Sequence, residues 1–350
     1  YKKLSMSKKN SSVNLKNGLK EFKDLSKIFL DFKNKLDTLN KKNYLIAVSG
    51  GPDSLALAAL TKAYSINKKT KFYYVLVDHN LRKESEKEAN KVKKILKKKQ
   101  IYLRIIKNKK KIAKNIQAEA RNARYEILVN FCKKNKVKTL LTAHNLEDQV
   151  ETFFIRLSRG SGLKGLSAMK SVSKIDRQVN LYRPLLDIKK KFLIKISKII
   201  FGNFIKDPSN NDIKYLRSKI RNLKKPLESS GIKYDKIFRS IQNLSSSRST
   251  IENFFNKIFK EIIRKRNGEV FINLKKFSEL NIDAKIALIN EAIKTLKKNY
   301  YDLRSKKVEN LIDIINKRDF KKTTLGGCIF LKKGENLCLK VEKIKNIKKK

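Results

Sequence analysis

The stretch Tyr44–Ala63, YLIAVSGGPDSLALAALTKA, decides the fold. Its first five residues predict a buried strand, Ser49–Ser54 predict a tight turn, and the apolar run that follows predicts a helix. Backbone N–H groups of a glycine turn at a helix N-terminus form an anion site, which the helix dipole reinforces. The carboxylate of Asp53 would repel a phosphate unless a metal ion lay between them. We therefore expect a Mg²⁺-bound nucleotide at this turn, although neither GxxxxGK[ST] nor GxGxxG is present.

Three further strand and helix signals follow the opening stretch. The strands are KFYYVLVDHN (71–80), IYLRIIK (101–107) and KTLLTAHN (138–145), and each precedes a helical segment. Nearly continuous apolar strands that alternate with helices predict an α/β fold, a Rossmann-like parallel sheet with helices on both faces. In such a sheet, ligands bind beyond the carboxyl ends of the strands.

Changes in pattern along the chain predict four parts. Residues 1–40 form a basic N-terminal extension with one helix, and residues 41–228 form the nucleotide-binding domain. Residues 229–300 are expected to be a helical domain that binds RNA. Residues 301–350 are expected to form a small α/β segment, with a β-hairpin around a Lys-Gly-Glu-Asn turn and a disordered basic tail.

The composition is strongly basic, with 86 Lys and Arg against 32 Asp and Glu, a net charge of +54. A nucleic acid is the partner that this charge favours, although lysine is abundant along the whole chain. No apolar run reaches the ~18 to 20 residues that span a bilayer, so we expect no membrane contact. Three scattered cysteines, Cys132, Cys328 and Cys338, predict a reducing cytoplasm and no disulfide, zinc site or iron–sulfur cluster.

Both histidines of the chain end a predicted strand. His79 closes VLVDHN and His144 closes LLTAHN, so both are expected at the edge of the sheet that carries the glycine turn. After His144, the segment LEDQVET adds three acids, and helical spacing places two of them, Asp148 and Glu151, near one face with His144. Acids at this edge can hold Mg²⁺ or pair with a substrate amine.

The turn SGGPDS (49–54) resembles the pyrophosphate loop of the N-type ATP pyrophosphatases, which cleave ATP between its α- and β-phosphates. Other segments are similar to one family among them, the tRNA(Ile)-lysidine synthases. The similar segments are DHNLRKES (78–85), EARNARY (119–125), AHNLEDQVET (143–152), RLSRGSGLKGLSAM (156–169), RPLL (183–186) and DPSN (207–210). The resemblance covers about residues 44–226.

The resemblance implies an ATP-dependent ligase that modifies tRNA. ATP adenylates the C2 carbonyl oxygen of the wobble cytidine of tRNA(Ile) with a CAU anticodon, and the ε-amine of free lysine then attacks C2 and displaces AMP to give lysidine. It implies ATP as substrate, Mg²⁺ as cofactor, and tRNA(Ile) and lysine as partners in the cytoplasm; a homodimer is an arrangement that it allows.

The resemblance also assigns roles to residues. The expected ATP-binding residues are Ser49, Gly50, Gly51, Pro52, Asp53, Ser54, Asp78 and His79. The expected catalytic residues are Asp53, Arg121, Arg124 and His144. The expected lysine-binding residues are Asp148, Glu147 and Glu151, and the expected Mg²⁺ ligands are Asp53 and Asp148. The expected tRNA-binding residues are Arg156, Arg159 and Lys164, which would contact tRNA phosphates or order a loop.

Two positions depart from the family pattern, and two other functions stay open. Asn145 stands where the family often has a second histidine, and Glu147 stands where an aspartate is common.

A tRNA 2-thiolation enzyme with the same loop is one alternative, but it needs a reactive cysteine pair or cluster ligands. An amide-forming synthetase is disfavoured because no glutaminase domain is present. The alternative of another class is a basic RNA-binding protein with a decayed nucleotide site, and the intact motifs argue against it.

Overall fold

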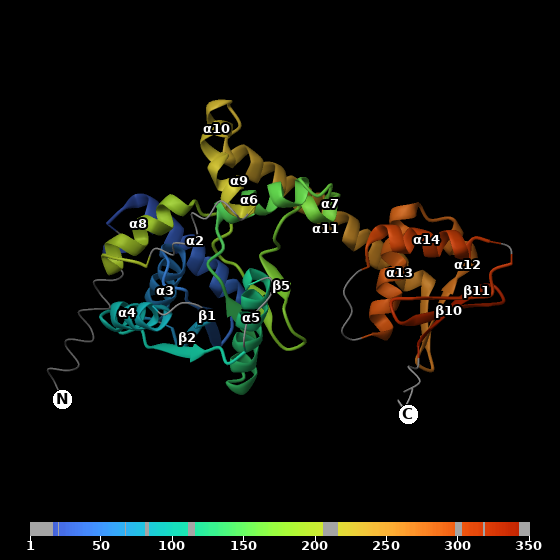
Figure 1. The fold of residues 1–350 in the computed structure, drawn as a ribbon, viewed down its shortest axis with the longest axis horizontal. Coiled ribbons are helices and arrows are strands. Elements are labelled where there is room, and N and C mark those ends of the chain that lie inside the picture. The colour runs from blue at the N-terminus through green and yellow to red at the C-terminus, as the bar shows by residue number, and fades with distance from the viewer. Residues whose placement is uncertain are drawn as a thin grey trace. The chain divides into compact units, whose positions relative to one another are not determined.

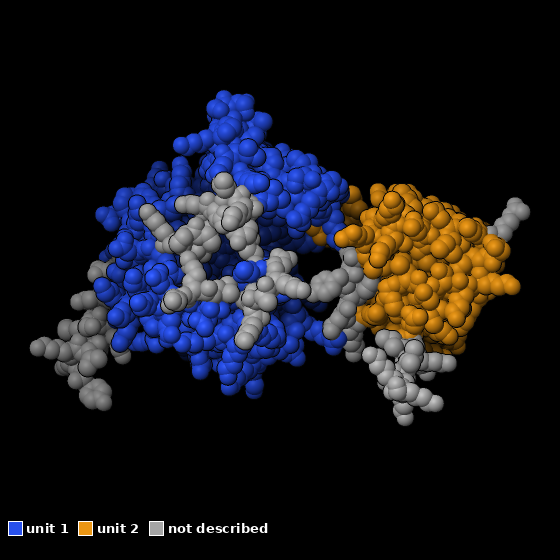
Figure 2. Space-filling view, in the orientation of Figure 1, with its two compact units in different colours: residues 1–245 blue, residues 246–350 orange. Residues whose placement is uncertain are grey.

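The computed structural model describes residues 17–19, 21–66, 68–80, 84–110, 116–205, 216–297, 303–317 and 319–342. Within these ranges the chain forms two compact units, residues 1–245 and 246–350 (Figure 2). The segment DPSN, residues 81–83 of DHNLRKES, residues 1–16 of the N-terminal extension and the tail 343–350 lie outside the described residues.

The first unit is built on a six-stranded sheet of order β3-β2-β1-β4-β6-β5. Its strands are β1 (Asn43–Ala47), β2 (Lys71–Asp78), β3 (Leu103–Lys107), β4 (Thr139–Leu141), β5 (Val172–Lys174) and β6 (Asn180–Tyr182). The four strands predicted from the sequence are parallel, as expected, and β6 adds a fifth parallel strand next to β4. The edge strand β5 pairs antiparallel with β6, and neither was predicted, because three-residue strands give too little alternation to detect.

Helices cover both faces of this sheet (Figure 1). The helices of the first unit are α2 (Lys23–Leu39), α3 (Pro52–Ser65), α4 (Ser85–Lys97), α5 (Ile116–Lys134), α6 (Leu146–Leu157), α7 (Leu163–Leu166), α8 (Lys190–Phe201), α9 (Leu216–Asn222), α10 (Lys224–Ser229) and the first part of α11 (Tyr234–Ile262). Side chains of α2, α3, α4 and α8 share a buried cluster with one face of the strands. Those of α5, including Cys132, pack on the other face. The sheet is therefore a buried middle layer, as the apolar strands predict.

The N-terminal helix α2 belongs to the core of the first unit. Leu25, Phe32 and Leu36 are buried in the same cluster as the sheet, and the hydroxyl of Tyr64 on α3 donates to Asp37 at 2.7 Å. A helix was predicted here from apolar residues at helical spacing, and it is confirmed. The domain limits drawn from the sequence stay predictions.

The second unit combines helices with a five-stranded antiparallel sheet of order β7-β8-β11-β10-β9. Besides the end of α11, its elements are β7 (Ile263–Arg266), β8 (Glu269–Asn273), α12 (Leu274–Ser278), α13 (Ile282–Leu296), α14 (Ser305–Ile315), β9 (Lys322–Leu325), β10 (Cys328–Lys333) and β11 (Asn336–Val341). The hairpin predicted at the chain's end is β10–β11. The sequence missed that three more strands extend it to a sheet. In β7 and β9, lysine and arginine at exposed positions weaken the strand signal.

None of the helices in the described ranges combines the length and the apolar character that crossing a bilayer requires.

Candidate active site

The glycine turn between β1 and α3 is held by the hydroxyl of Ser54. Its Oγ accepts from the backbone N–H groups of Ser49 and Gly50, both at 3.1 Å, and donates to the carbonyl of Gly51 at 3.0 Å. We expected Ser54 to supply a hydroxyl to the ligand, and the structure uses that hydroxyl inside the turn. Gly51 caps α3 and Pro52 is its first residue, so the positive end of the helix dipole lies at the turn.

Gly50 is required at its position for two separate reasons. Its φ of +87° lies in the left-handed region, which side chains disfavour. A Cβ on Gly50 would also lie 2.4 Å from Cγ2 of Val92 on α4. The turn thus packs directly against a core residue of a neighbouring helix.

Asp53 carries the most informative carboxylate of the turn. Its Oδ1 is buried and has no hydrogen-bond partner among the described residues. Burial raises the pKa of Asp53 to about 6, and the nearby carboxylates of Asp148 and Glu147 act in the same direction. The ammonium of Lys190 and a hydrogen bond from Asn145 oppose that rise. A buried carboxylate oxygen with no donor is what a cation would stabilise.

The residues after β2 also present buried atoms without partners. Asp78 is 3% exposed; its Oδ1 accepts from the backbone N–H of Asn80 at 2.9 Å. Its Oδ2 and the Nδ1 of His79 are buried and unpaired among the described residues. Burial and the positive charge of Arg124 lower the pKa of His79. These groups lie at the carboxyl end of β2, next to the strand that carries the glycine turn.

Helix α5 contributes two arginines and a tyrosine. Nη2 of Arg121 donates to the hydroxyl of Tyr125 at 3.3 Å, and the guanidinium carbons of Arg121 and Arg124 lie 5.0 and 5.7 Å from the centre of its ring. Burial lowers the pKa of Arg124, as does the neighbouring Arg121. Within the described ranges neither arginine pairs with a carboxylate, so both charges are available to an anion.

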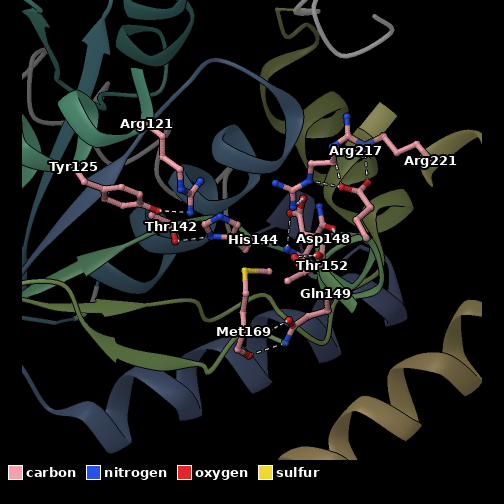
Figure 3. A network of polar contacts seen from close by, with 12 residues as sticks. Arg121, Tyr125, Thr142, His144, Asp148, Gln149, Thr152, Met169, Arg217 and Arg221 are labelled. Carbon is pink, nitrogen blue, oxygen red and sulfur yellow. Dashed lines mark hydrogen bonds and ion pairs between the residues drawn. The ribbon is translucent and has the colours of Figure 1, made fainter. Parts of the chain in front are cut away.

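His144 lies at the end of β4 among these arginines (Figure 3). Its Nδ1 is 2.9 Å from Oγ1 of Thr142. Burial lowers its pKa to about 3, and the positive charges of Arg183 and Arg121 are the largest of those that add to this effect. His144 is therefore a neutral imidazole at physiological pH.

A titration tests the state of the two histidines. We expect the pKa of both imidazoles to lie below 6.5 in the folded protein, and His144 to stay neutral down to about pH 4. Because the unfolded chain binds the proton more tightly, stability should fall as the pH drops below about 6.5. With only two histidines, NMR of ¹⁵N-labelled protein resolves both, and a His79→Asn variant assigns them. A His144 signal that titrates near pH 6.5 would contradict this result.

The N-terminus of α6 is closed by a capping box. The backbone N–H of Asn145 donates to Oδ2 of Asp148 at 3.0 Å, and the backbone N–H of Asp148 donates to Oδ1 of Asn145 at 3.0 Å. Asn145 is thus the N-cap of α6, which explains why asparagine is stable at this position. The spacing Asn-x-x-Asp before an apolar helix would have predicted this cap from the sequence.

Glu151 joins α6 to α9 through two arginines (Figure 3). Nε of Arg217 lies 2.6 Å from one oxygen, and Nε of Arg221 lies 2.5 Å from the other. Arg217 also reaches Oδ1 of Asp148 at 3.2 Å. Both oxygens of Glu151 are therefore engaged, and its side chain is only 4% exposed. The sequence reasoning missed Arg217 and Arg221, although their i, i+4 spacing in LRSKIR indicates one helix face.

Glu147, like Glu151, links α6 to neighbouring helices. Its Oε2 accepts from the backbone N–H of Lys190 at 2.8 Å, at the start of α8, and Nζ of Lys224 lies 3.3 Å from its Oε1. The ammonium of Lys224 also lies 4.9 Å from the ring centre of Tyr234. Glu147 therefore ties together three helices around the site.

Replacing Glu151 by glutamine should weaken its contacts with Arg217 and Arg221 on α9. Glutamine removes the charge and presents an N–H₂ group to two guanidinium groups, so we expect a loss of about 1–3 kcal/mol in the stability of the first unit. Urea unfolding measures the loss. Glu291→Gln is the control, because its pair with Lys294 is exposed and should contribute under ~0.5 kcal/mol. Equal losses of stability from the two substitutions would contradict a stabilising role of the Glu151 ion pairs.

The glycine-rich segment after α6 is held by side chains of that helix. Nη1 of Arg156 donates to the carbonyls of Gly165 at 2.7 Å and Ala168 at 2.8 Å. Gln149 makes two hydrogen bonds with the backbone of Met169, at 2.9 and 2.8 Å. Arg156 thus orders the loop, one of its two expected roles in tRNA binding.

The sites predicted from the sequence divide into two groups. The structure brings together, at the carboxyl edge of the sheet, the glycine turn and the following side chains: Asp53, Asp78, His79, Arg121, Arg124, His144 and Asp148. Arg159 and Lys164 are exposed on the segment after α6. Besides the two arginines of α9, the sequence reasoning assigned no role to Thr142, Lys190 or Arg183, although Arg183 begins the segment RPLL. Within the described residues, no cluster of three or more His, Cys, Asp or Glu could hold a metal ion by itself.

Comparisons with known proteins agree with this geometry. A model described as "PP-loop domain" matches residues 23–227. The tRNA(Ile)-lysidine synthase of Wolbachia pipientis wMel is 33% identical over 299 residues, which cover 84% of this chain and 69% of that protein. That of Wolbachia sp. subsp. Brugia malayi (strain TRS) is 32% identical over 90% of this chain and 74% of its own length. Among solved structures, the U34-tRNA thiolase NcsA from Methanococcus maripaludis shares the fold, with a TM-score of 0.54, 20% identity, and coverage of 63% of this chain and 78% of that one.

Proposed function

This chain belongs to the PP-loop domain family and, within it, to the tRNA(Ile)-lysidine synthases, and on that basis we propose how its residues divide the reaction. The activity is the ATP-dependent ligation of lysine to the wobble cytidine of tRNA(Ile), by way of an adenylated cytidine. The observation that carries the assignment of the site is the unpaired, buried Oδ1 of Asp53 at the start of α3.

The pyrophosphate end of ATP is bound by the turn Ser49–Ser54. The N-terminus of α3 supplies the dipole, and Gly50 permits the close approach of phosphate. Asp78 and His79, at the end of the neighbouring strand, lie beside the nucleoside. Their unpaired Oδ2 and Nδ1 atoms are free to bond with it.

The residues present fit a Mg²⁺ ion bound between Asp53 and the phosphates. When bound, the ion neutralises negative charge on the leaving pyrophosphate. Asp53 is the principal protein ligand in this proposal. Asp148 is the second, although its oxygens already accept from Asn145 and Arg217. These two carboxylates would hold the ion only together with the substrate's phosphate oxygens and water, as is common for Mg²⁺.

Adenylation is assisted by Arg121 and Arg124, which have no carboxylate partner among the described residues and stabilise negative charge at the α-phosphate. His144 has a different role. An imidazole with a pKa of about 3 is a weak base, so we assign to it hydrogen bonding to the target nucleotide, with Thr142 fixing its orientation.

The attacking lysine is bound by Asp148 in this proposal. Glu147 and Glu151 support it indirectly, because Glu147 fixes α8 and Glu151 fixes α9 around the site. Arg159 and Lys164 are exposed and contact RNA phosphates. The proposal also includes a homodimer, although no residue is assigned to its interface. Sedimentation would detect the dimer.

The rival thiolation activity needs reactive cysteines near the nucleotide. Cys132 is on α5 and is buried against the sheet, where burial raises its pKa to about 12. Cys328 and Cys338 are buried in the second unit. No cysteine therefore offers a nucleophile or cluster ligand at the sheet edge of the first unit.

Labelled lysine tests the function directly. The protein is incubated with ATP, Mg²⁺, radiolabelled lysine and tRNA(Ile) bearing CAU, and label in the tRNA is the expected result. A tRNA(Met) with the same anticodon serves as control and should stay unlabelled. Folded protein that leaves intact tRNA(Ile) unlabelled would contradict the proposed function.

A further inference from the structure

Arg183 is a buried arginine, and among the described residues only Nη1 of its guanidinium makes hydrogen bonds. It follows β6 directly and is 9% exposed. Its Nη1 donates to the carbonyl of Lys170 at 2.7 Å and to Oγ of Ser173 at 3.0 Å. Its Nε is buried without a partner, and Nη2 makes no hydrogen bond to any residue in the described ranges. The edge formed by Nε and Nη2 is the one that binds two oxygens of a phosphate or carboxylate.

The strand register places Arg183 beside His144 and α5. Leu140 pairs with Leu181, and both pack in the cluster beneath α5, whereas the next pair, Leu141 and Tyr182, faces the opposite cluster. Because side chains alternate along a strand, the following pair, Thr142 and Arg183, is directed to the α5 face again. The backbone N–H of Thr142 donates to the carbonyl of Tyr182 at 3.0 Å, which continues the pairing to this point.

Three arginines therefore meet at this face without a carboxylate. Arg183, Arg121 and Arg124 form no ion pair among the described residues, and all three act on His144 to lower its pKa. Burial lowers the pKa of Arg183, and the positive charge of Arg121 acts in the same direction. Arg183 is buried, Arg124 is half-buried and Arg121 is exposed, so the positive charge of Arg183 in particular is costly unless an anion joins it.

We propose that Arg183 is an anion-binding residue of the active site, which binds a phosphate through Nε and Nη2 together with Arg121 and Arg124 while Nη1 holds the segment Lys170–Ser173. This proposal rests on the proposed function. Two sources can supply the phosphate, the α-phosphate of ATP and the RNA backbone next to the target cytidine. β6 lies two strands from β1, about 10 Å away, so Arg183 follows a strand at a distance from the one that leads into the glycine turn.

Arg183 has two roles in this proposal, binding a phosphate and holding the segment Lys170–Ser173. Two substitutions distinguish these roles experimentally. Arg183→Met removes the charge and the donors at nearly constant length. Ser173→Ala removes one loop hydrogen bond and leaves the charge in place. Arg177→Met is the matched control, because Arg177 is exposed in the turn between β5 and β6 and away from the site.

Two binding experiments identify the source of the phosphate. Calorimetry measures α,β-methylene ATP with Mg²⁺, and fluorescence anisotropy measures a CAU anticodon stem-loop over a range of salt. If the RNA supplies the phosphate, Arg183→Met should weaken stem-loop binding at least about tenfold and lower the salt slope by about 0.7–0.9. If ATP supplies it, the nucleotide affinity should fall instead. In either case adenylation should slow by about 100-fold.

Ser173→Ala and Arg177→Met should change each quantity by less than about threefold. Unchanged affinities in Arg183→Met, with adenylation equal to that of Ser173→Ala, would overturn the proposal and leave Arg183 a loop anchor. If Arg183→Met does not fold, Arg183→Lys decides in the same way, because lysine keeps the charge but loses the two-pronged edge. Failure of lysine transfer by the unmodified protein would contradict the proposed function alone, because the binding experiments need no turnover.

Discussion

Asp53→Asn is expected to reduce pyrophosphate release by at least about 100-fold and to leave tRNA affinity within about twofold. The substitution keeps the shape of the side chain and removes the charge that would hold Mg²⁺ on the phosphates. Oδ1 of Asp53 is buried at the start of α3 with no hydrogen-bond partner among the described residues, and without its charge Asp148 alone would remain as a carboxylate ligand. Near-normal pyrophosphate release would mean that the metal is held elsewhere.

The same substitution should stabilise the protein in the absence of nucleotide. Burial raises the pKa of Asp53 to about 6, whereas an unfolded aspartate has a pKa of ~3.9. The folded state therefore binds the proton more tightly, and ionised Asp53 destabilises it at pH values above about 6. We expect Asp53→Asn to raise the free energy of unfolding by about 1–3 kcal/mol at pH 7.5, and the gain should disappear as the pH falls toward ~4.

Denaturation of both proteins between pH 4 and pH 8 measures this gain. Asp283→Asn is the matched control, since Asp283 lies exposed in the first turn of α13 and carries no comparable burial. It should lower stability slightly, by the ~0.3–1 kcal/mol of a helix-dipole interaction, and leave activity unchanged. Loss of activity in Asp53→Asn with no gain in stability would contradict the buried, unpaired carboxylate and would point to general damage to the turn.

Gly50→Ala is expected to lower activity by about 100-fold and to cost about 2–4 kcal/mol in the stability of the first unit. Alanine at a φ of +87° is strained by roughly 1 kcal/mol, and its Cβ would lie 2.4 Å from Val92 Cγ2, so the turn or α4 must move. A displacement of the turn moves the phosphate site away from the catalytic side chains, which is costly for rate.

Two further variants separate strain from clash. Gly231 has nearly the same φ, +86°, and no atom within 4 Å of a Cβ, so Gly231→Ala should cost only the strain. Val92→Ala removes the clashing methyl group, and the double variant with Gly50→Ala should therefore lose less stability than the sum of the single variants. Urea unfolding should be fitted with two transitions, because the chain has two compact units. Equal costs at Gly50 and Gly231 would contradict the packing of Val92 on the turn.

Much of the site could be predicted because short stretches of the sequence are enough to identify its residues. The glycine turn, the strand-end histidines and the arginines of α5 stand in short motifs, and a parallel sheet brings strand ends to one edge. The roles of the acids of α6 could not be predicted in this way. Asp148 closes a capping box and Glu151 binds two arginines of α9, and only the packing of α9 on α6 shows that Glu151 has no free oxygen.

The sequence by itself determined the α/β class, the phosphate-binding turn and the family, since these depend on residue type at short spacing. Tertiary structure alone decided the partners of those residues. It gave Asp53 its unpaired oxygen and brought Arg183, more than fifty residues distant in the chain, to the face of α5 beside Arg121. The physical reason is that charge, burial and hydrogen bonding depend on which segments fold against one another, and contacts between distant segments leave no periodic pattern in the sequence.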